Sequence, residues 1–100
     1  MKNQEMTRKI PLFDGINFGF WKKRMSYYLM SLGRRVRKSI LDEYKTPPTL
    51  LTDQDGRKAY IANAKALNSI TSGIIDSEFT KVISCDSTKQ MWDKLIVLYD

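Results

Sequence analysis

Apolar residues recur every three or four positions between residues 17 and 32, and this spacing predicts an amphipathic helix. Asn17 stands where an asparagine side chain caps a helix, and Gly33 stands where a left-handed glycine ends one. We therefore expect the first helix to run from Asn17 to about Leu32. Its inward positions are Phe18, Trp21, Met25, Tyr28, Leu29 and Leu32.

A second, shorter helix is predicted from Arg35 to about Tyr44, before a proline loop. It cannot pass Thr46-Pro47-Pro48, because proline clashes with the preceding turn and removes a backbone donor. Its expected inward residues are Val36, Ile40, Leu41 and Tyr44.

A third helix is predicted from about Asp53 to Ser72. Thr52 and Asp55 resemble a capping box with the shorter acid, and Gly73 follows the last periodic residue. Small side chains on this helix predict a face that a neighbouring helix approaches closely. The face is formed by Ala59, Ala62, Ala64 and Ala66, with Leu67 and Ile70.

A short fourth helix is expected over residues 77–83, with Phe79, Val82 and Ile83 facing inward. A strand over the β-branched stretch 81–83 is the alternative, although no partner strand is evident elsewhere in the sequence. Helix is the better interpretation.

The last helix is predicted to begin at the capping box Ser87-Thr88-Lys89-Gln90. Met91, Trp92, Leu95, Leu98 and Tyr99 share one face, and Ile96 and Val97 fall outside it. A helix that is apolar on nearly every side is buried all round or has a partner. The candidate self-association residues are therefore Leu95, Ile96, Val97, Leu98 and Tyr99, which would meet a downstream segment or another subunit.

These elements predict an all-α fold, a compact bundle of about five helices. Residues 12–100 form the expected domain, which we expect to continue beyond residue 100 in the full-length protein. Residues 1–11 are a predicted flexible arm that anchors at Leu12 and Phe13. One hundred residues are enough for one hydrophobic core but not for two.

The absence of histidine narrows the chemistry. Histidine is the usual general base near neutral pH, and with a single cysteine, Cys85, neither a disulfide nor a Cys/His zinc site is expected. Cys85 is interpreted as a small hydrophobic side chain. The acidic pairs stand near predicted segment ends, where acids act as caps: Asp42/Glu43, Asp53/Asp55 and Asp76/Glu78. We predict a protein that is not an enzyme and needs no cofactor or metal.

No apolar run approaches the roughly eighteen residues that span a bilayer, and the polar start is no signal peptide. The expected location is cytoplasmic, with no membrane partner.

Positive charge is concentrated in the first half of the chain. Residues 1–50 hold eleven Lys or Arg and four Asp or Glu, whereas residues 51–100 hold six and seven. The polarity favours an anionic partner such as RNA, although it equally suits a solvated face. Two clusters make the candidate nucleic-acid contact: Lys22, Lys23, Arg24, Arg34, Arg35, Arg37 and Lys38. The helical period spreads each cluster around its helix, so no single flat patch is predicted.

Two motifs carry a resemblance to a known family. The stretch PLFDGINFGFWKKRM places Phe13, Gly15, Asn17, Phe18, Trp21 and Met25 at the spacing of F-x-G-x-N-Y/F-x-x-W-x-x-x-M, and TKQMWDKLIVLY supplies Thr88, Lys89, Trp92, Leu95 and Tyr99. Together they resemble the Gag (capsid) polypeptide of plant copia-type LTR retrotransposons, from about Pro11 to the last residue. Trp21 and Trp92 are nevertheless interpreted as core residues, because tryptophan at helical spacing is usually packed.

The sequence departs from the family at Arg37, where members commonly have a tryptophan. Burying an unpaired charge costs several kcal/mol, which is comparable to the whole free energy of unfolding of a small domain. We therefore expect Arg37 to be exposed, or to extend its guanidinium outward on the aliphatic stem.

The resemblance implies a capsid-building module that associates with itself into particles and makes at most non-specific contact with RNA. The alternative is a domesticated, free-standing Gag-derived protein that binds intact Gag or a host protein. A third interpretation, an RNA-binding module in its own right, is less favoured, since only Tyr27 and Tyr28 are near the basic clusters as stacking platforms.

Overall fold

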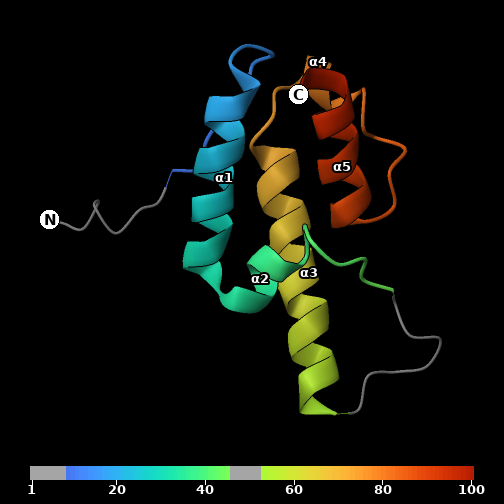
Figure 1. Ribbon diagram of the computed structural model, residues 1–100. Helices are drawn as coiled ribbons and strands as arrows, with labels where there is room; N and C mark the ends of the chain where they lie inside the picture. The colour runs from blue at the N-terminus through green and yellow to red at the C-terminus, as the bar shows by residue number, and fades with distance from the viewer. Residues whose placement is uncertain (1–8, 46–52) are drawn as a thin grey trace, which may run out of the picture.

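The computed structural model describes residues 9–45 and 53–100 (Figure 1). This part of the chain is helical and has no β-strand, which confirms the predicted all-α bundle. Its helices are α1 (Phe18–Leu32), α2 (Arg34–Lys38), α3 (Gln54–Ser72), α4 (Asp76–Phe79) and α5 (Thr88–Tyr99).

Three longer helices form the body of the fold. α3 contacts both α1 and α5, α1 also meets α5 through Trp21 and Trp92, and the short α2 crosses beside α1 and α3 (Figure 1). The chain runs along α1 in one direction and along α3 and α5 in the other, so α5 ends near the start of α1. A Lys22–Asp100 ion pair of 2.5 Å connects these two ends.

An aromatic cluster joins the two ends of the chain in the core. The Phe13 ring lies 4.9 Å from Tyr99 and 5.4 Å from Trp21, measured between ring centroids. Trp21 in turn lies 5.7 Å from Trp92. Edge and tilted arrangements at these distances stabilise aromatic pairs beyond their buried area. The large apolar residues of both motifs therefore occupy core positions, as the spacing predicts, whereas Asn17 of the first motif is exposed.

The start of α1 is where expected, but its cap works differently. Asn17 is in the left-handed conformation, with φ 59° and ψ 54°, and its side chain makes no capping hydrogen bond. Asparagine tolerates this conformation better than most residues. The predicted side-chain cap is therefore wrong. Asn17 and Gly15, which has φ 97°, instead form the turn that leads into α1.

The other end of α1 also differs in detail. Gly33 has φ 142° and ψ 154°, a conformation that favours glycine but is not the predicted left-handed helical cap. The chain is extended at this one residue, so α2 begins immediately afterwards at Arg34.

The helix α2 is shorter than predicted. After Lys38 the backbone continues as tight turns, in which Ile40 N–H donates to Arg37 O and Leu41 N–H donates to Lys38 O. These three-residue steps rotate Leu41 outward, so its predicted inward position is wrong: the side chain is 51% exposed. Val36 and Ile40 are buried as expected.

The helix α3 begins at a different cap. Asp53 Oδ2 accepts from Gly56 N–H at 3.3 Å, whereas the predicted cap Thr52 is outside the described residues. Ala62 and Ala66 are buried on the inner face, but Ala64 is exposed and does not belong to it. Asp55 forms an ion pair with Arg35 of 3.3 Å between oxygen and nitrogen.

A short backbone pairing attaches the segment before α1 to the end of α3. Phe13 N–H donates to Gly73 O at 2.7 Å, and Ile75 N–H donates to Phe13 O at 3.1 Å. Phe13 is fully buried, as predicted for the anchor, but Leu12 points to solvent. Pairing with extended backbone explains the difference, because successive side chains there face opposite sides.

The last helices follow the predicted order with shorter bounds for α4. After Phe79 the chain forms turns, not a strand, and Val82 is buried while Ile83 is exposed, against the prediction for Ile83. Ser87 caps α5 as expected, its Oγ accepting from Gln90 N–H at 3.1 Å. Of the helices described, none has the length and apolar character needed to cross a bilayer.

Candidate interaction groove

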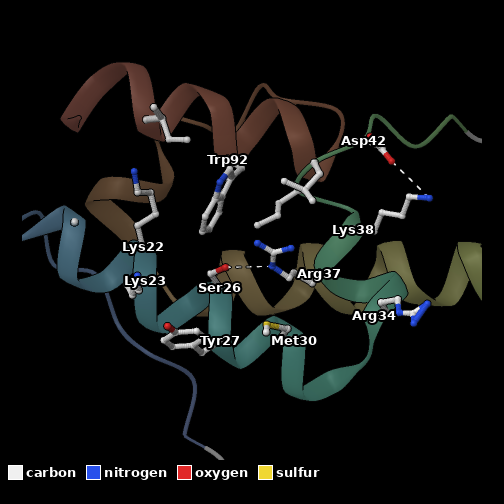
Figure 2. A pocket seen from close by; sticks show the side chains of 14 residues that line it. Lys22, Lys23, Ser26, Tyr27, Met30, Arg34, Arg37, Lys38, Asp42 and Trp92 are labelled. Atoms are coloured by element: carbon white, nitrogen blue, oxygen red, sulfur yellow. Dashed lines mark hydrogen bonds and ion pairs between the residues drawn. The ribbon is translucent and has the colours of Figure 1, made fainter.

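An open groove of about 940 Å³ lies between α1, α2 and α5 (Figure 2). α1 and α5 meet through the Trp21 and Trp92 rings, and α2 ends early at Lys38. The surface between them is therefore hollowed. The turn after α2 supplies Ile40, Leu41 and Asp42 to one side of the groove.

The floor of the groove is apolar. Trp92 and Ile96 come from α5, and Met30 and Tyr27 come from α1. The Trp92 ring packs on the core and is only 6% exposed, so the groove uncovers only a small part of its surface. Met30 and Tyr27 are about half exposed at the edge.

The rim of the groove is basic. Five of the seven predicted nucleic-acid residues line it: Lys22, Lys23, Arg34, Arg37 and Lys38. The folded chain thus brings together charges that the helical period alone would have spread around two helices. These five residues come from α1 and α2, which contact each other, whereas Arg24 and Arg35 do not line the groove.

Arg37 is at the centre of this arrangement (Figure 2). It is half-buried, and its Nε donates to Ser26 Oγ at 3.4 Å. The expectation of simple exposure is therefore wrong. A hydroxyl partner and the open groove allow the guanidinium to remain hydrated while its stem packs on apolar atoms.

The rim cations differ in their partners. Lys22 pairs with Asp100 at 2.5 Å and Lys38 pairs with Asp42 at 3.8 Å. For Lys23, Arg34 and Arg37, the described part of the chain provides no carboxylate within ion-pair distance. These three charges are thus available to an anionic group from outside.

The remaining two predicted basic residues lie elsewhere. Arg35 pairs with Asp55, and Arg24 lies over the exposed Phe20 ring at 5.6 Å from its centroid. Lys23 lies similarly over Tyr27, at 5.8 Å. Phe20 is an exposed aromatic beside a basic cluster that the sequence reasoning missed, and its position directly before Trp21-Lys22-Lys23-Arg24 is the signal that could have found it.

The predicted self-association run in α5 is only partly accessible. Leu95 is fully buried and so is not available for the predicted contact, whereas Ile96 and Tyr99 are partly buried against the core. The helix period turns them toward α1 and α3. Val97, 81% exposed, and Leu98 are the members that face solvent.

A second apolar surface precedes and begins α1. Leu12, Ile16 and Phe20 line one shallow hollow of about 310 Å³. Ile16 is 74% exposed. Sequence reasoning missed this surface because it placed Leu12 inside, although the four-residue spacing of Ile16 and Phe20 could have indicated it.

The acidic residues are engaged in structural contacts. Glu78, 7% exposed, accepts from the Tyr99 hydroxyl and forms an ion pair with Lys81 of 3.2 Å. Lys81 Nζ also donates to Tyr99 Oη at 2.7 Å, and this bond, followed by Glu78, raises the pKa of Lys81 above the ordinary lysine value. Within residues 9–45 and 53–100, no group of three metal-ligating side chains gathers. Cys85 packs against the core.

Comparisons with known proteins do not extend this picture. Searches of protein-family models, of curated proteins and of solved structures gave no significant match to this chain. The resemblance to copia-type Gag therefore rests on the motif residues alone and stays a prediction.

Proposed function

We propose that this chain is a non-enzymatic, capsid-like assembly module of the copia Gag type, which associates with other copies through exposed apolar surface. The observation that carries the proposal is the hollow formed by Leu12, Ile16 and Phe20, whose side chains all face solvent. Contiguous exposed apolar surface commonly marks a protein contact.

Weak contacts are sufficient for such a module. A shell repeats the same contact many times, so each interface can be small while the assembly as a whole is stable. Val97 and Leu98 on α5 add a second accessible apolar position to the same molecule. Two separate surfaces allow one copy to contact more than one neighbour.

The lack of histidine in the sequence supports the non-enzymatic part of the proposal. Several acids that could have served as a general base have structural roles instead: Asp53 caps α3, and Asp42 forms an ion pair with Lys38.

The apolar surface is tested by a paired substitution, Leu12→Ser with Ile16→Ser. We expect sedimentation velocity to show concentration-dependent association of the native chain, and a shift of the variant towards monomer. The matched control is Ile83→Ser, which removes an exposed apolar side chain from a different site. Equal association of all three proteins would contradict the proposed surface.

A loose RNA contact is the second part of the proposal. Lys23, Arg34 and Arg37 are the cations best placed for it, because other rim charges already have carboxylate partners. Such contact would depend on phosphate and not on base identity.

A further inference from the structure

The groove between α1, α2 and α5 presents two kinds of chemistry at once. Its floor carries Trp92, Ile96 and Met30, and its rim carries Lys23, Arg34 and Arg37. An apolar floor gains free energy only when apolar atoms displace water from it. The rim has three cations that lack carboxylate partners in the described residues. It therefore attracts a partner that carries anionic groups.

We propose that this groove binds an acidic amphipathic helical segment of another protein. Apolar side chains of the segment would pack on Met30, Leu41 and Ile96, which line the groove. Its carboxylates would face Lys23, Arg34 and Arg37. Amphipathic helices bind grooves through apolar residues at positions i, i+3, i+4 and i+7. This proposal goes beyond self-association and does not depend on it.

The dimensions of the groove fit side chains of a polypeptide. Its volume, about 940 Å³, is at the upper end of the roughly 300–1,000 Å³ typical of ligand pockets. The groove opens to solvent and is lined by side chains of α1, α2 and α5 and of the turn after α2 (Figure 2), so a segment can enter it from outside.

The charge of the rim selects an acidic segment. Asp42 is the only acid that lines the groove within the described residues, and Lys38 already pairs with it at 3.8 Å. Arg37 reaches in from α2 towards Ser26, so its guanidinium lies beside the apolar floor. A carboxylate next to an apolar side chain matches this juxtaposition, and a guanidinium can bind it through two hydrogen bonds.

RNA fits the groove less well. It could contact the rim through phosphates, but the floor offers mainly aliphatic surface and the Trp92 ring, which is 6% exposed and packs on Trp21. Single-stranded RNA needs accessible rings for stacking. Tyr27 is the one half-exposed ring of the lining.

The probe is a fluorescent synthetic helical peptide of about 18 residues, with leucine at positions i, i+3, i+4 and i+7 and glutamate on the opposite face. We expect it to bind the whole chain in fluorescence anisotropy with a micromolar Kd. Three comparison probes define the chemistry: a scrambled sequence, a version with lysine in place of glutamate, and a version with serine in place of leucine. All three are expected to bind at least about tenfold more weakly.

Matched variants place the binding in the groove. Lys23→Glu or Arg34→Glu should weaken peptide binding about three- to tenfold, whereas Lys65→Glu on α3 makes the same change of charge outside the groove and should not. Met30→Ser should weaken binding, and its control Ile83→Ser should not. These side chains are exposed or at the surface, so circular dichroism should show the same fold in all variants.

Several results would overturn the proposal. They are failure of the peptide to bind, equal binding of the scrambled or serine version, and an equal effect of Lys65→Glu and Lys23→Glu. A single-stranded RNA oligonucleotide that displaces the peptide and loses affinity on Met30→Ser would also overturn it, by assigning the groove to RNA. Self-association is read separately by sedimentation, so its failure leaves the peptide result unaffected.

Discussion

The indole rings of Trp21 and Trp92 pack together with their centroids 5.7 Å apart and their planes at 37°. Trp21 belongs to α1 and Trp92 to α5, so this contact joins the two motifs of the chain. Trp21 Nε1 also donates to Pro11 O at 3.0 Å, which attaches the segment before α1 to the same cluster. The pair thus connects three parts of the fold.

We expect truncation of either ring to destabilise the fold strongly. Trp21→Ala or Trp92→Ala should lower the free energy of unfolding by roughly 3–5 kcal/mol, a large share of the ~5–15 kcal/mol typical of a domain. Because the rings are in contact, the double variant should lose less than the sum of the single losses. Urea unfolding measures all three, and strictly additive losses or a nearly unchanged midpoint would refute the assigned contact.

Two glycines should respond in opposite directions to the same substitution. A Cβ at Gly73 would lie 2.5 Å from Met25 Cε and 2.8 Å from Pro11 O, whereas a Cβ at Gly19 meets nothing within 4 Å. Gly73→Ala should therefore destabilise the fold by about 1–3 kcal/mol. Gly19→Ala, inside α1, should stabilise it by about 0.5–1 kcal/mol. Thermal unfolding checks both, and a neutral Gly73→Ala would contradict the close packing of α1 against the end of α3.

The Lys81 contacts predict a loss of stability at alkaline pH. Hydrogen bonds to Tyr99 and Glu78 raise the pKa of Lys81 in the folded state. Its ammonium therefore stabilises the fold fully below the ordinary lysine pKa of about 10.4, and this contribution is lost as pH rises through the folded-state pKa. We expect the stability difference between the native chain and Lys81→Met to shrink over that range.

The matched control for this prediction is Lys94→Met, since Lys94 is exposed on α5. Urea midpoints measured from about pH 8 to pH 11.5 give the difference for each variant. A Lys81→Met difference that is constant with pH, or equal to that of Lys94→Met, would show that the Tyr99 and Glu78 contacts do not stabilise the fold.

Any RNA affinity of the chain should fall steeply with salt. Three cations that lack carboxylate partners predict a slope of about −2 in a plot of log affinity against log salt for a single strand. Lys23→Glu should reduce the magnitude of that slope, and changing the RNA sequence should leave affinity almost unchanged. Filter binding across salt concentrations measures these quantities. An affinity that is independent of salt would contradict electrostatic contact.

Sequence periodicity was enough to predict the helical architecture. The three-four spacing from Phe18 to Leu29 and the Ser87 cap each indicate a helix through local interactions alone, and the structure confirms both. The bounds of α2 were not predictable in this way. After Lys38 the chain forms turns that leave Ile40 buried and Leu41 exposed, an arrangement of the tertiary fold that local spacing does not encode.

The candidate groove was predictable only in part. The sequence identified the basic residues Lys23, Arg34 and Arg37, but not that they share a hollow with Trp92 of a distant helix. Trp92 was predicted to be a core residue, and its 6% exposure agrees with that prediction. The sequence did not show that the same ring also lines a groove, because the other lining residues come from distant parts of the chain. Such a site depends on tertiary contacts between residues far apart in the chain.

Self-association of the chain can be measured directly by light scattering coupled to size exclusion, over a concentration series with and without short RNA. We expect a molar mass that rises with concentration and rises further when RNA is added, because RNA neutralises the positive charge of residues 1–50. A monomer at every concentration, with and without RNA, would contradict it.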